Sequence, residues 1–351
     1  MRYTATGVGF LVAAMVATPA FAGPKWEVGE NAWLSLGFLG QVHYSHVDDA
    51  DPKNDFFLRR GRFILSGQVM DGVKFFVETD NDNAGKAGTS VSTDIQDAFV
   101  DVRLGHSDHW VEAGLILLPF SFENKTSAAK LLGLDYNSEV IKLTNTFVWR
   151  DYGVEVHGNV GKRFAYRVGV FDGYDEGSNN TATNKNPDAG LRYTGHVAFN
   201  PIGEVETGWF LTQERFKGTY LSLGAGGDYQ KDATGTSKGA ANTMDSTAWV
   251  ADFQSGVQIS DAVHLTVDGA WYNWNGATFE GDTAFVEAGL LVAKVMPTAK
   301  YSFQNPDEGD SVTDYTVGVH YFLKGHNARA GLEYRFGDSS NQALLGLQFL
   351  L

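Results

Sequence analysis

The chain has 351 residues, with 27 Lys and Arg against 42 Asp and Glu, a formal net charge of −15 and no cysteine. The acidic balance argues against nucleic-acid binding, and the missing cysteines exclude disulfides, c-type haem attachment and thiolate chemistry. The 41 glycines, only 8 prolines and 13% aromatic residues are typical of many strands joined by glycine-rich turns, and barrels of this length fold as one domain.

The first 22 residues have the pattern of a secretory signal peptide. Arg2 gives a short basic region, residues 8–17 an apolar core, and Ala20-Phe21-Ala22 a small-x-small cleavage site. A membrane anchor is the weaker alternative, because the apolar run is shorter than the roughly 20 residues that a spanning helix needs. The expected mature protein is therefore one exported domain, residues 23–351.

Strand-like runs follow one another from there to the last residue, without a sustained helical period. The run 56–69, FFLRRGRFILSGQV, is one example that alternates with period two. Sixteen strands are expected, over residues 33–46, 57–69, 73–80, 94–104, 110–118, 147–157, 163–171, 189–199, 219–230, 246–259, 262–274, 283–292, 298–305, 313–323, 327–336 and 342–351.

The connections between these runs alternate in length. Short turns such as 70–72 and 260–262 alternate with long ones such as 81–93, 119–146 and 274–283. Short periplasmic turns and long extracellular loops are typical of outer-membrane barrels. The stretch 201–217, PIGEVETGWFLTQERFK, does not fit this scheme and is assigned to an irregular periplasmic connection, with eighteen strands as the alternative.

The two faces of the strands indicate a membrane barrel rather than a soluble sheet protein. Residues 164–170 place Phe164, Tyr166, Val168 and Val170 on one face, with polar and small residues on the other. Sixteen such strands fit an apolar outside and a wet lumen. Aromatic side chains near strand ends are expected to form girdles at the membrane interfaces: Trp33, Tyr44, Trp110, Trp149, Tyr152, Trp249, Trp271 and Trp274.

The alternation also divides the three arginines of the run 56–69. Arg60 and Arg62 are expected to face the lumen, while Arg59 shares the other face and is expected to reach lipid headgroups. Over all strands, ten basic and eleven acidic side chains are assigned to the lumen, so the charges nearly cancel. The basic residues proposed to line the pore are Arg60, Arg62, Lys74, Arg163, Arg167 and Arg192.

Several segments resemble the phosphate-selective porin O and P family. They are FFLRRGRFILSG (56–67), GLILLPFSFENKTS (114–127), WRDYGVEVHG (149–158), YRVGVFDG (166–173) and LGAGGDYQ (223–230), spread over most of the chain in the family's order. The resemblance implies a trimeric, 16-stranded porin whose third extracellular loop, about residues 119–146, folds inward and narrows the pore. The residues that it places in this constriction loop are Glu123, Lys125, Lys130 and Lys142.

The predicted function is passive diffusion of small hydrophilic solutes, including anions such as phosphate, across the outer membrane. Two interpretations of the lumen arginines stay open: an anion track, or braces that hold the loop and the wall through carboxylates. The alternative function is a structural sheath around a periplasmic partner such as a cytochrome. An enzyme is not expected, and no catalytic residue or cofactor is assigned.

The motifs that suggest metal binding are weak. DNDNAG (80–85) lacks the later ligands of a calcium loop, and His106 and His109 lie in a short turn without a third ligand in the sequence nearby. No metal site is therefore predicted. Acidic loops at 48–55, 171–177 and 305–311 are either solvated or bridge lipopolysaccharide through divalent cations. Outer-membrane lipid and lipopolysaccharide are the expected surroundings.

Overall fold

The computed structural model describes residues 23–143, 148–174, 189–206, 208–211, 213, 215–234, 244–276 and 279–351. The regular structure in these ranges is β-strand throughout. Within them, no helix is long and apolar enough to cross a membrane. The predicted signal peptide, residues 1–22, lies outside the described residues.

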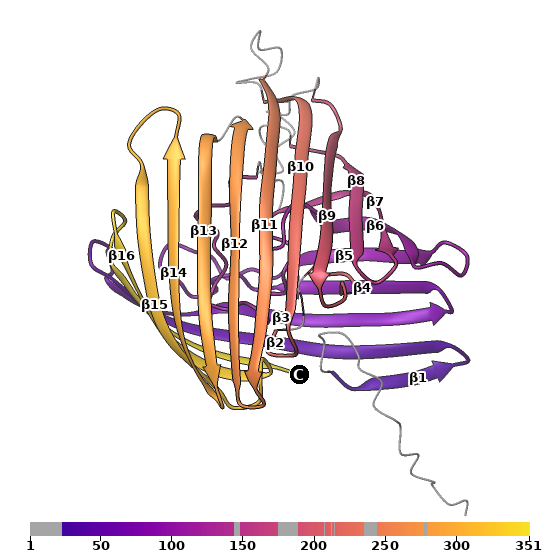
Figure 1. Cartoon of the computed structure of the whole chain (residues 1–351), viewed down its shortest axis with the longest axis horizontal. Coiled ribbons are helices and arrows are strands. Elements are labelled where there is room, and N and C mark those ends of the chain that lie inside the picture. Colours follow the sequence, from indigo (N-terminus) through magenta and orange to yellow (C-terminus); the bar gives the residue numbers. More distant parts are fainter. Residues whose placement is uncertain are drawn as a thin grey trace, which may run out of the picture.

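Seventeen strands follow one another along the chain (Figure 1). They are β1 (Lys25–Gly29), β2 (Ala32–Val47), β3 (Asn54–Met70), β4 (Val73–Asp80), β5 (Asp94–Arg103), β6 (His109–Leu117), β7 (Arg150–Val160), β8 (Phe164–Phe171), β9 (Arg192–Ile202), β10 (Tyr220–Thr234), β11 (Met244–Ser260), β12 (Val263–Gly276), β13 (Phe279–Val292), β14 (Val295–Pro306), β15 (Val312–Phe322), β16 (Ala328–Gly337) and β17 (Gln342–Leu350).

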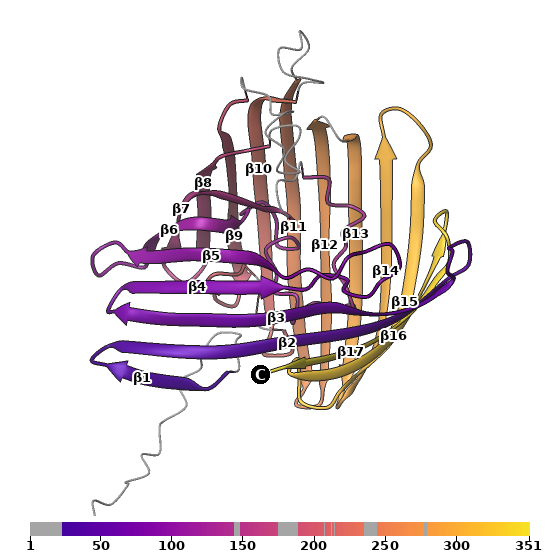
Figure 2. The same ribbon diagram turned by 180° about the vertical axis from the view of Figure 1, so that it is seen from behind.

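Strands β2 to β17 form one closed antiparallel barrel. Each pairs with the next in sequence, and β17 closes the ring against β2, with Leu345 opposite Tyr44. Figure 2 shows β17 beside β2 from behind. This arrangement confirms the predicted sixteen strands. The short β1 is an addition that pairs only with the start of β2, where Trp26 lies opposite Leu34.

Two connections differ from the predicted scheme. The prediction of a long loop at 274–283 is wrong, because β12 and β13 continue through most of this range, with Asn275 opposite Glu280. The stretch 203–219, between β9 and β10, forms no strand in its described residues. It leaves from the same end of the barrel as the short turns, where Gly23 and Leu351 also lie, and this end is periplasmic in barrels of this type.

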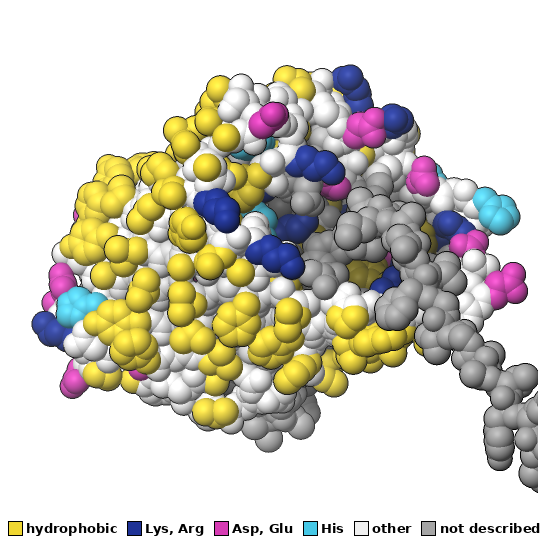
Figure 3. All heavy atoms as spheres, turned by 90° about the horizontal axis from the view of Figure 1, so that it is seen from below, with side chains coloured by type: hydrophobic (Ala, Val, Ile, Leu, Met, Phe, Trp, Pro, Cys, Tyr) yellow, Lys and Arg dark blue, Asp and Glu magenta, His cyan; other side chains and the backbone are white. Residues whose placement is uncertain are grey.

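The outer face of the barrel is apolar, as the alternation predicts. Val168, Val317 and Leu347 are about half exposed in the isolated chain, and Figure 3 shows hydrophobic side chains over much of the outer wall. A surface of this kind suits lipid rather than water. In the same view, from below, Lys and Arg side chains stand around a hollow near the centre.

The buried apolar core lies inside the barrel. Ile116 at the end of β6 and Leu118, Phe120 and Val140 of the connection after it pack with Tyr272 of β12 in one cluster. Two residues predicted for the interfacial girdles, Trp149 and Trp274, belong to the same cluster and are almost fully buried. The girdle assignment is wrong for these two, because the inward connection offers their rings an apolar surface inside the lumen.

Candidate functional site

The connection between β6 and β7, residues 118–149 with 144–147 outside the described part, lies within the lumen and is called the inward loop below. It contacts widely separated parts of the wall. Gln41 Nε2 on β2 donates to Ala128 O at 3.1 Å, while the amide of Phe122 donates to Asp252 Oδ2 on β11 at 2.7 Å. Because these contacts lie on both sides of the loop, it crosses the lumen rather than lying along one wall.

Arg60 joins the wall to the inward loop. Its guanidinium, 2% exposed, donates to Asp135 Oδ1 of the loop at 2.7 Å and to Gln41 Oε1 at 2.8 Å. It also lies over the ring of Tyr136, with 5.1 Å to the centroid. Charge-assisted bonds of this kind are strong and directional. The residue faces the lumen, and its charge is already neutralised by Asp135.

Arg59 was expected to face lipid, and that expectation is wrong. It forms ion pairs with Asp135 of the inward loop and with Asp82. The pairing of β2 with β3 shifts at this point, from Gln41 opposite Arg60 to Val42 opposite Leu58. A bulge inserts one unpaired residue into a strand and breaks the alternation. Arg59 is that residue, and both neighbouring arginines therefore reach Asp135.

The other arginines proposed for the pore are held in similar pairs, with one exception. Arg62 donates to Glu78 Oε1 at 2.7 Å and to Asp80 Oδ2 at 2.9 Å, both on β4. Arg167 pairs with Glu155. Arg192 makes two parallel bonds with Asp228, of 2.7 and 3.0 Å. Arg163 stands exposed in the turn before β8, where it donates to Pro201 O at 2.8 Å.

Lys74 and the four charged loop residues have different surroundings. Lys74 Nζ lies 4.2 Å from the centroid of Trp110, which is thereby placed on the lumen side. Lys125 is buried, donates to Leu117 O at 2.8 Å and pairs with Glu155 at 3.2 Å. Burial lowers the pKa of Lys125. Lys130 lies partly exposed and its carbonyl accepts from Arg215.

Glu123 is a buried carboxyl of the inward loop. Its Oε1 accepts from the amide of Asn137 at 2.8 Å and from Asn137 Nδ2 at 3.1 Å. Burial raises its pKa to about 7, because the charged form loses its hydration. Lys142, by contrast, is half-buried with its Nζ 5.2 Å from the ring centroid of Phe279. Burial lowers the pKa of Lys142.

The described residues of 203–219, called the inward turn, also enter the lumen, which the sequence did not predict. Its Trp209 packs on Phe76 and Phe99 of β4 and β5, with ring centroids 4.9 and 5.5 Å away. Arg215 pairs with Asp268 on β12, and Leu211 N donates to Lys125 O at 3.3 Å. The turn therefore supports the inward loop from the periplasmic side. The length of this connection, and the Trp and Arg side chains in it, were the features of the sequence that could have indicated its inward position.

A cavity of about 20 Å³, enough for about one water molecule, remains between the inward loop and the wall formed by β13 to β16. Glu287, Lys300 and Glu333 line it from the wall, and Asp135 from the loop. Lys300 Nζ lies 3.1 Å from Glu139 Oε1, and Glu333 Oε1 accepts from Leu134 N at 2.8 Å. Three acidic residues and one basic residue therefore border this space.

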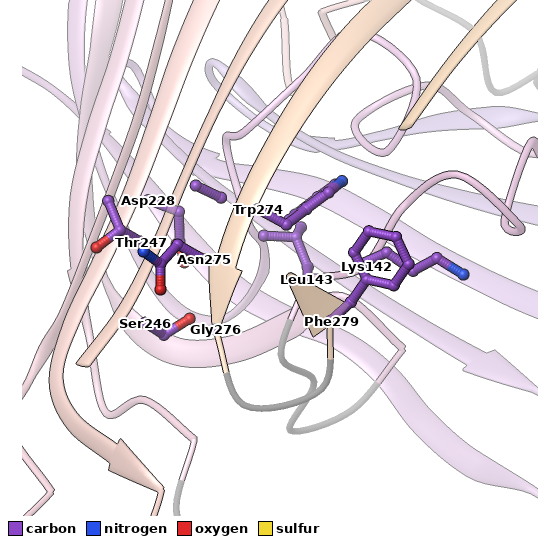
Figure 4. Close-up of a pocket in the computed structure, with 10 residues that line it drawn as sticks. Lys142, Leu143, Asp228, Ser246, Thr247, Trp274, Asn275, Gly276 and Phe279 are labelled. Atoms are coloured by element: carbon purple, nitrogen blue, oxygen red, sulfur yellow. The ribbon is translucent and has the colours of Figure 1, made fainter. Parts of the chain in front are cut away.

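A smaller cavity of about 10 Å³ lies near the extracellular ends of β10 to β13 (Figure 4). Lys142 and Phe279 stand together on one side of it, with Asp228 and Asn275 on the other. Lys142 turns its amine away from this space toward the Phe279 ring, and Asp228 is paired with Arg192. The space is about the size of one water molecule, so these residues mark the extracellular mouth rather than a solute site.

Comparison with known proteins identifies the family and the fold. The family model described as phosphate-selective porin O and P matches residues 36–308. No curated protein gives a significant sequence match. Among solved structures, an anion-selective porin from Comamonas acidovorans is similar with a TM-score of 0.62 and 13% identity, over 91% of this chain and 100% of that one.

Two further structures have the same architecture. A loop-deletion mutant of OmpT, an outer membrane protein of Vibrio cholerae, gives a TM-score of 0.57 and 14% identity, over 92% of this chain and 100% of the other. A triple mutant of a Rhodopseudomonas blastica porin gives 0.53 and 16%, over 91% and 100%. At these identities the structures establish the barrel fold and nothing finer.

Proposed function

This chain belongs to the phosphate-selective porin O and P family and forms an outer-membrane channel for solute diffusion. We propose that small hydrophilic solutes pass through it between the inward loop and the wall of β13 to β16. The single observation that carries this route is the cavity bordered by Glu287, Lys300 and Glu333. This cavity lies inside the closed barrel, and the protein is a multi-pass β-barrel of the bacterial outer membrane.

In this proposal the lumen arginines are braces rather than a track for anions. Each of four lumen arginines forms an ion pair with a carboxylate of the protein: Arg60, Arg62, Arg167 and Arg192. A paired guanidinium attracts a passing anion only weakly, because the neighbouring carboxylate repels it. The acidic border of the cavity leads us to expect no anion preference, and a modest preference for cations.

Anion passage is the second candidate. The family description names phosphate, and the similar Comamonas acidovorans structure is titled an anion-selective porin. Lys142 at the extracellular mouth would be the first contact for a solute of this kind. Under this candidate the arginine pairs would have to open and exchange their carboxylates for phosphate during transport.

A sheath around a periplasmic partner is not favoured. The inward loop and the inward turn occupy the lumen together, and Arg215 of the turn contacts the carbonyl of Lys130 in the loop. A folded partner chain would have to displace both segments. We further propose that the protein is a homotrimer, as porins typically are, with its acidic extracellular loops next to lipopolysaccharide.

Planar bilayers test the proposal. Purified protein should insert in stepwise conductance increments, and its reversal potential in a KCl gradient should lie near zero or on the cation side. Absence of conductance at any voltage would overturn the channel route. A strongly anion-side reversal potential would replace the first candidate by the second.

A further inference from the structure

The inner wall carries a group of side chains that the solute route does not use, and we propose that it binds one divalent transition-metal ion. The group consists of Asp101 on β5, Glu112 on β6 and His157 on β7. Asp101 lies directly opposite Glu112 across the strand pair, and His157 lies opposite Trp110, two residues from Glu112. The alternation of the strands therefore points all three side chains to the same side of the wall.

The spacing of the ligand atoms fits a metal ion. His157 Nε2 lies 3.0 Å from Asp101 Oδ1 and 3.8 Å from Glu112 Oε2, and one ligand atom from each residue lies within 4.8 Å of the others. Bonds of about 2.0–2.2 Å in tetrahedral geometry separate neighbouring ligand atoms by roughly 3.4 Å. The two measured distances lie on either side of that value, so small rotations of the side chains complete the geometry.

One atom of the group points independently to a missing ligand. Glu112 is 1% exposed, and its Oε2 has no hydrogen-bond partner among the described residues. A buried carboxylate oxygen without a partner is costly, since it has lost its hydration without compensation. His157 Nε2 is 3.8 Å from this oxygen, beyond hydrogen-bond distance. A cation between these atoms would satisfy the oxygen.

The surrounding charges leave room for a cation. Three carboxyl groups, Asp101, Glu112 and Glu155, lie beside two cations, Lys125 and Arg167, which both pair with Glu155. When all five groups are ionised, their net charge is −1, which attracts a cation. Lys125 Nζ is 3.9 Å from Glu112 Oε1, the oxygen that does not face the histidine.

A further contact positions Asp101. Trp209 Nε1, from the inward turn, donates to Asp101 Oδ2 at 3.2 Å, which leaves Oδ1 directed at His157. Outer contacts of this kind orient the ligands of metal sites. A mixed set of one imidazole and two carboxylates suits zinc and similar ions rather than calcium or magnesium. The bound ion would join three strands beneath the inward loop.

Zinc titration of the folded full-length protein in detergent tests the proposal. Isothermal calorimetry should show one Zn²⁺ per chain for the wild type, with affinity at least tenfold weaker for Glu112→Gln, which keeps the side-chain volume. His196→Ala is the matched control, because His196 is also a buried histidine, 2.9 Å from a carboxylate oxygen of Asp252. It should retain wild-type binding.

A second readout covers variants that fold poorly. Zn²⁺ should raise the unfolding temperature of the wild type and of His196→Ala, and should not raise that of Glu112→Gln or Asp101→Asn. Absence of saturable binding to the wild type would overturn the site. Equal affinity in Glu112→Gln and the wild type would place the ion elsewhere, and would also overturn it. Neither result would bear on the channel route.

Discussion

The lumen wall at β3 and β4 and the wall at β13 to β16 carry charged residues in opposite arrangements. On β3, Arg62 meets Glu78 and Asp80 of the neighbouring strand, and little space is left around them. On the other wall, Glu287 and Glu333 border the cavity beside the inward loop. A charge that is paired and enclosed holds the fold together, whereas a charge next to open space can act on a solute.

The largest expected effect comes from breaking the braced side at Asp135. Asp135→Asn leaves the guanidiniums of Arg59 and Arg60 without their shared carboxylate. Removal of one partner from a buried pair costs about 3 kcal/mol of unfolding free energy. Denaturant unfolding in vesicles measures this loss, and single-channel recordings should show larger and noisier conductance as the inward loop is released.

Asp82→Asn is the matched control for Asp135→Asn. Asp82 also pairs with Arg59, but its side chain is 42% exposed. Its loss should cost less than about 1 kcal/mol, as for other exposed ion pairs. Equal destabilisation by both variants would mean that the buried ion pair with Asp135 stabilises the protein no more than the exposed pair with Asp82.

A somewhat smaller effect is expected from pH, because two carboxyls of the inward loop respond in opposite directions. Arg60 and Arg59 hold the pKa of Asp135 well below its usual range although burial opposes them, while burial raises that of Glu123 to about 7. From about pH 4.3, the unfolded pKa of glutamate, up to about pH 7, only the folded chain keeps the Glu123 proton. Its contribution to stability is therefore full at low pH and lost as the pH rises through 7.

Unfolding at pH 5 and at pH 8 measures this contribution. The wild type should lose roughly 2 kcal/mol more than Glu123→Gln over this interval, because glutamine does not titrate. Lys300 and Arg215 are the nearest cations that bias the same carboxyl. An identical pH dependence in the two proteins would contradict the raised pKa.

The smallest effect concerns the open wall. Glu287→Gln removes one acidic group beside the cavity without removing a brace, and the recordings are made at pH 9, where this buried carboxyl is ionised. One charge roughly 8 Å from a passing ion in water is worth about 0.5 kcal/mol, so the cation-to-anion permeability ratio should fall about twofold. Glu78→Gln, next to Arg62, should destabilise the protein more and should not lower the ratio. A larger fall in the permeability ratio for Glu78→Gln than for Glu287→Gln would contradict the distinction between the two walls.

The barrel itself could be predicted from the sequence because period-two alternation is a local property. The sixteen predicted strands match β2 to β17 in order, although the boundaries move by a few residues. Prediction failed where one residue breaks the period. The bulge at Arg59 reverses its face, and no feature of the run 56–69 marks an unpaired residue there.

Contacts between distant segments could not be predicted in the same way. The inward turn was expected only as an irregular connection, since the partners of Trp209 and Arg215 lie on β4, β5 and β12. The predicted absence of a metal site rested on short motifs. Asp101, Glu112 and His157 come together only through strand register, which a search for neighbouring ligands in the sequence does not detect.

The most direct test of the braced arginines is the effect of phosphate on the chloride current of single wild-type channels. If the guanidiniums of Arg60, Arg62, Arg167 and Arg192 are held by carboxylates, added phosphate finds none of these four free. The chloride current should then be unchanged up to millimolar phosphate. A saturable block at lower concentrations would show that phosphate binds in the lumen, and would contradict the account.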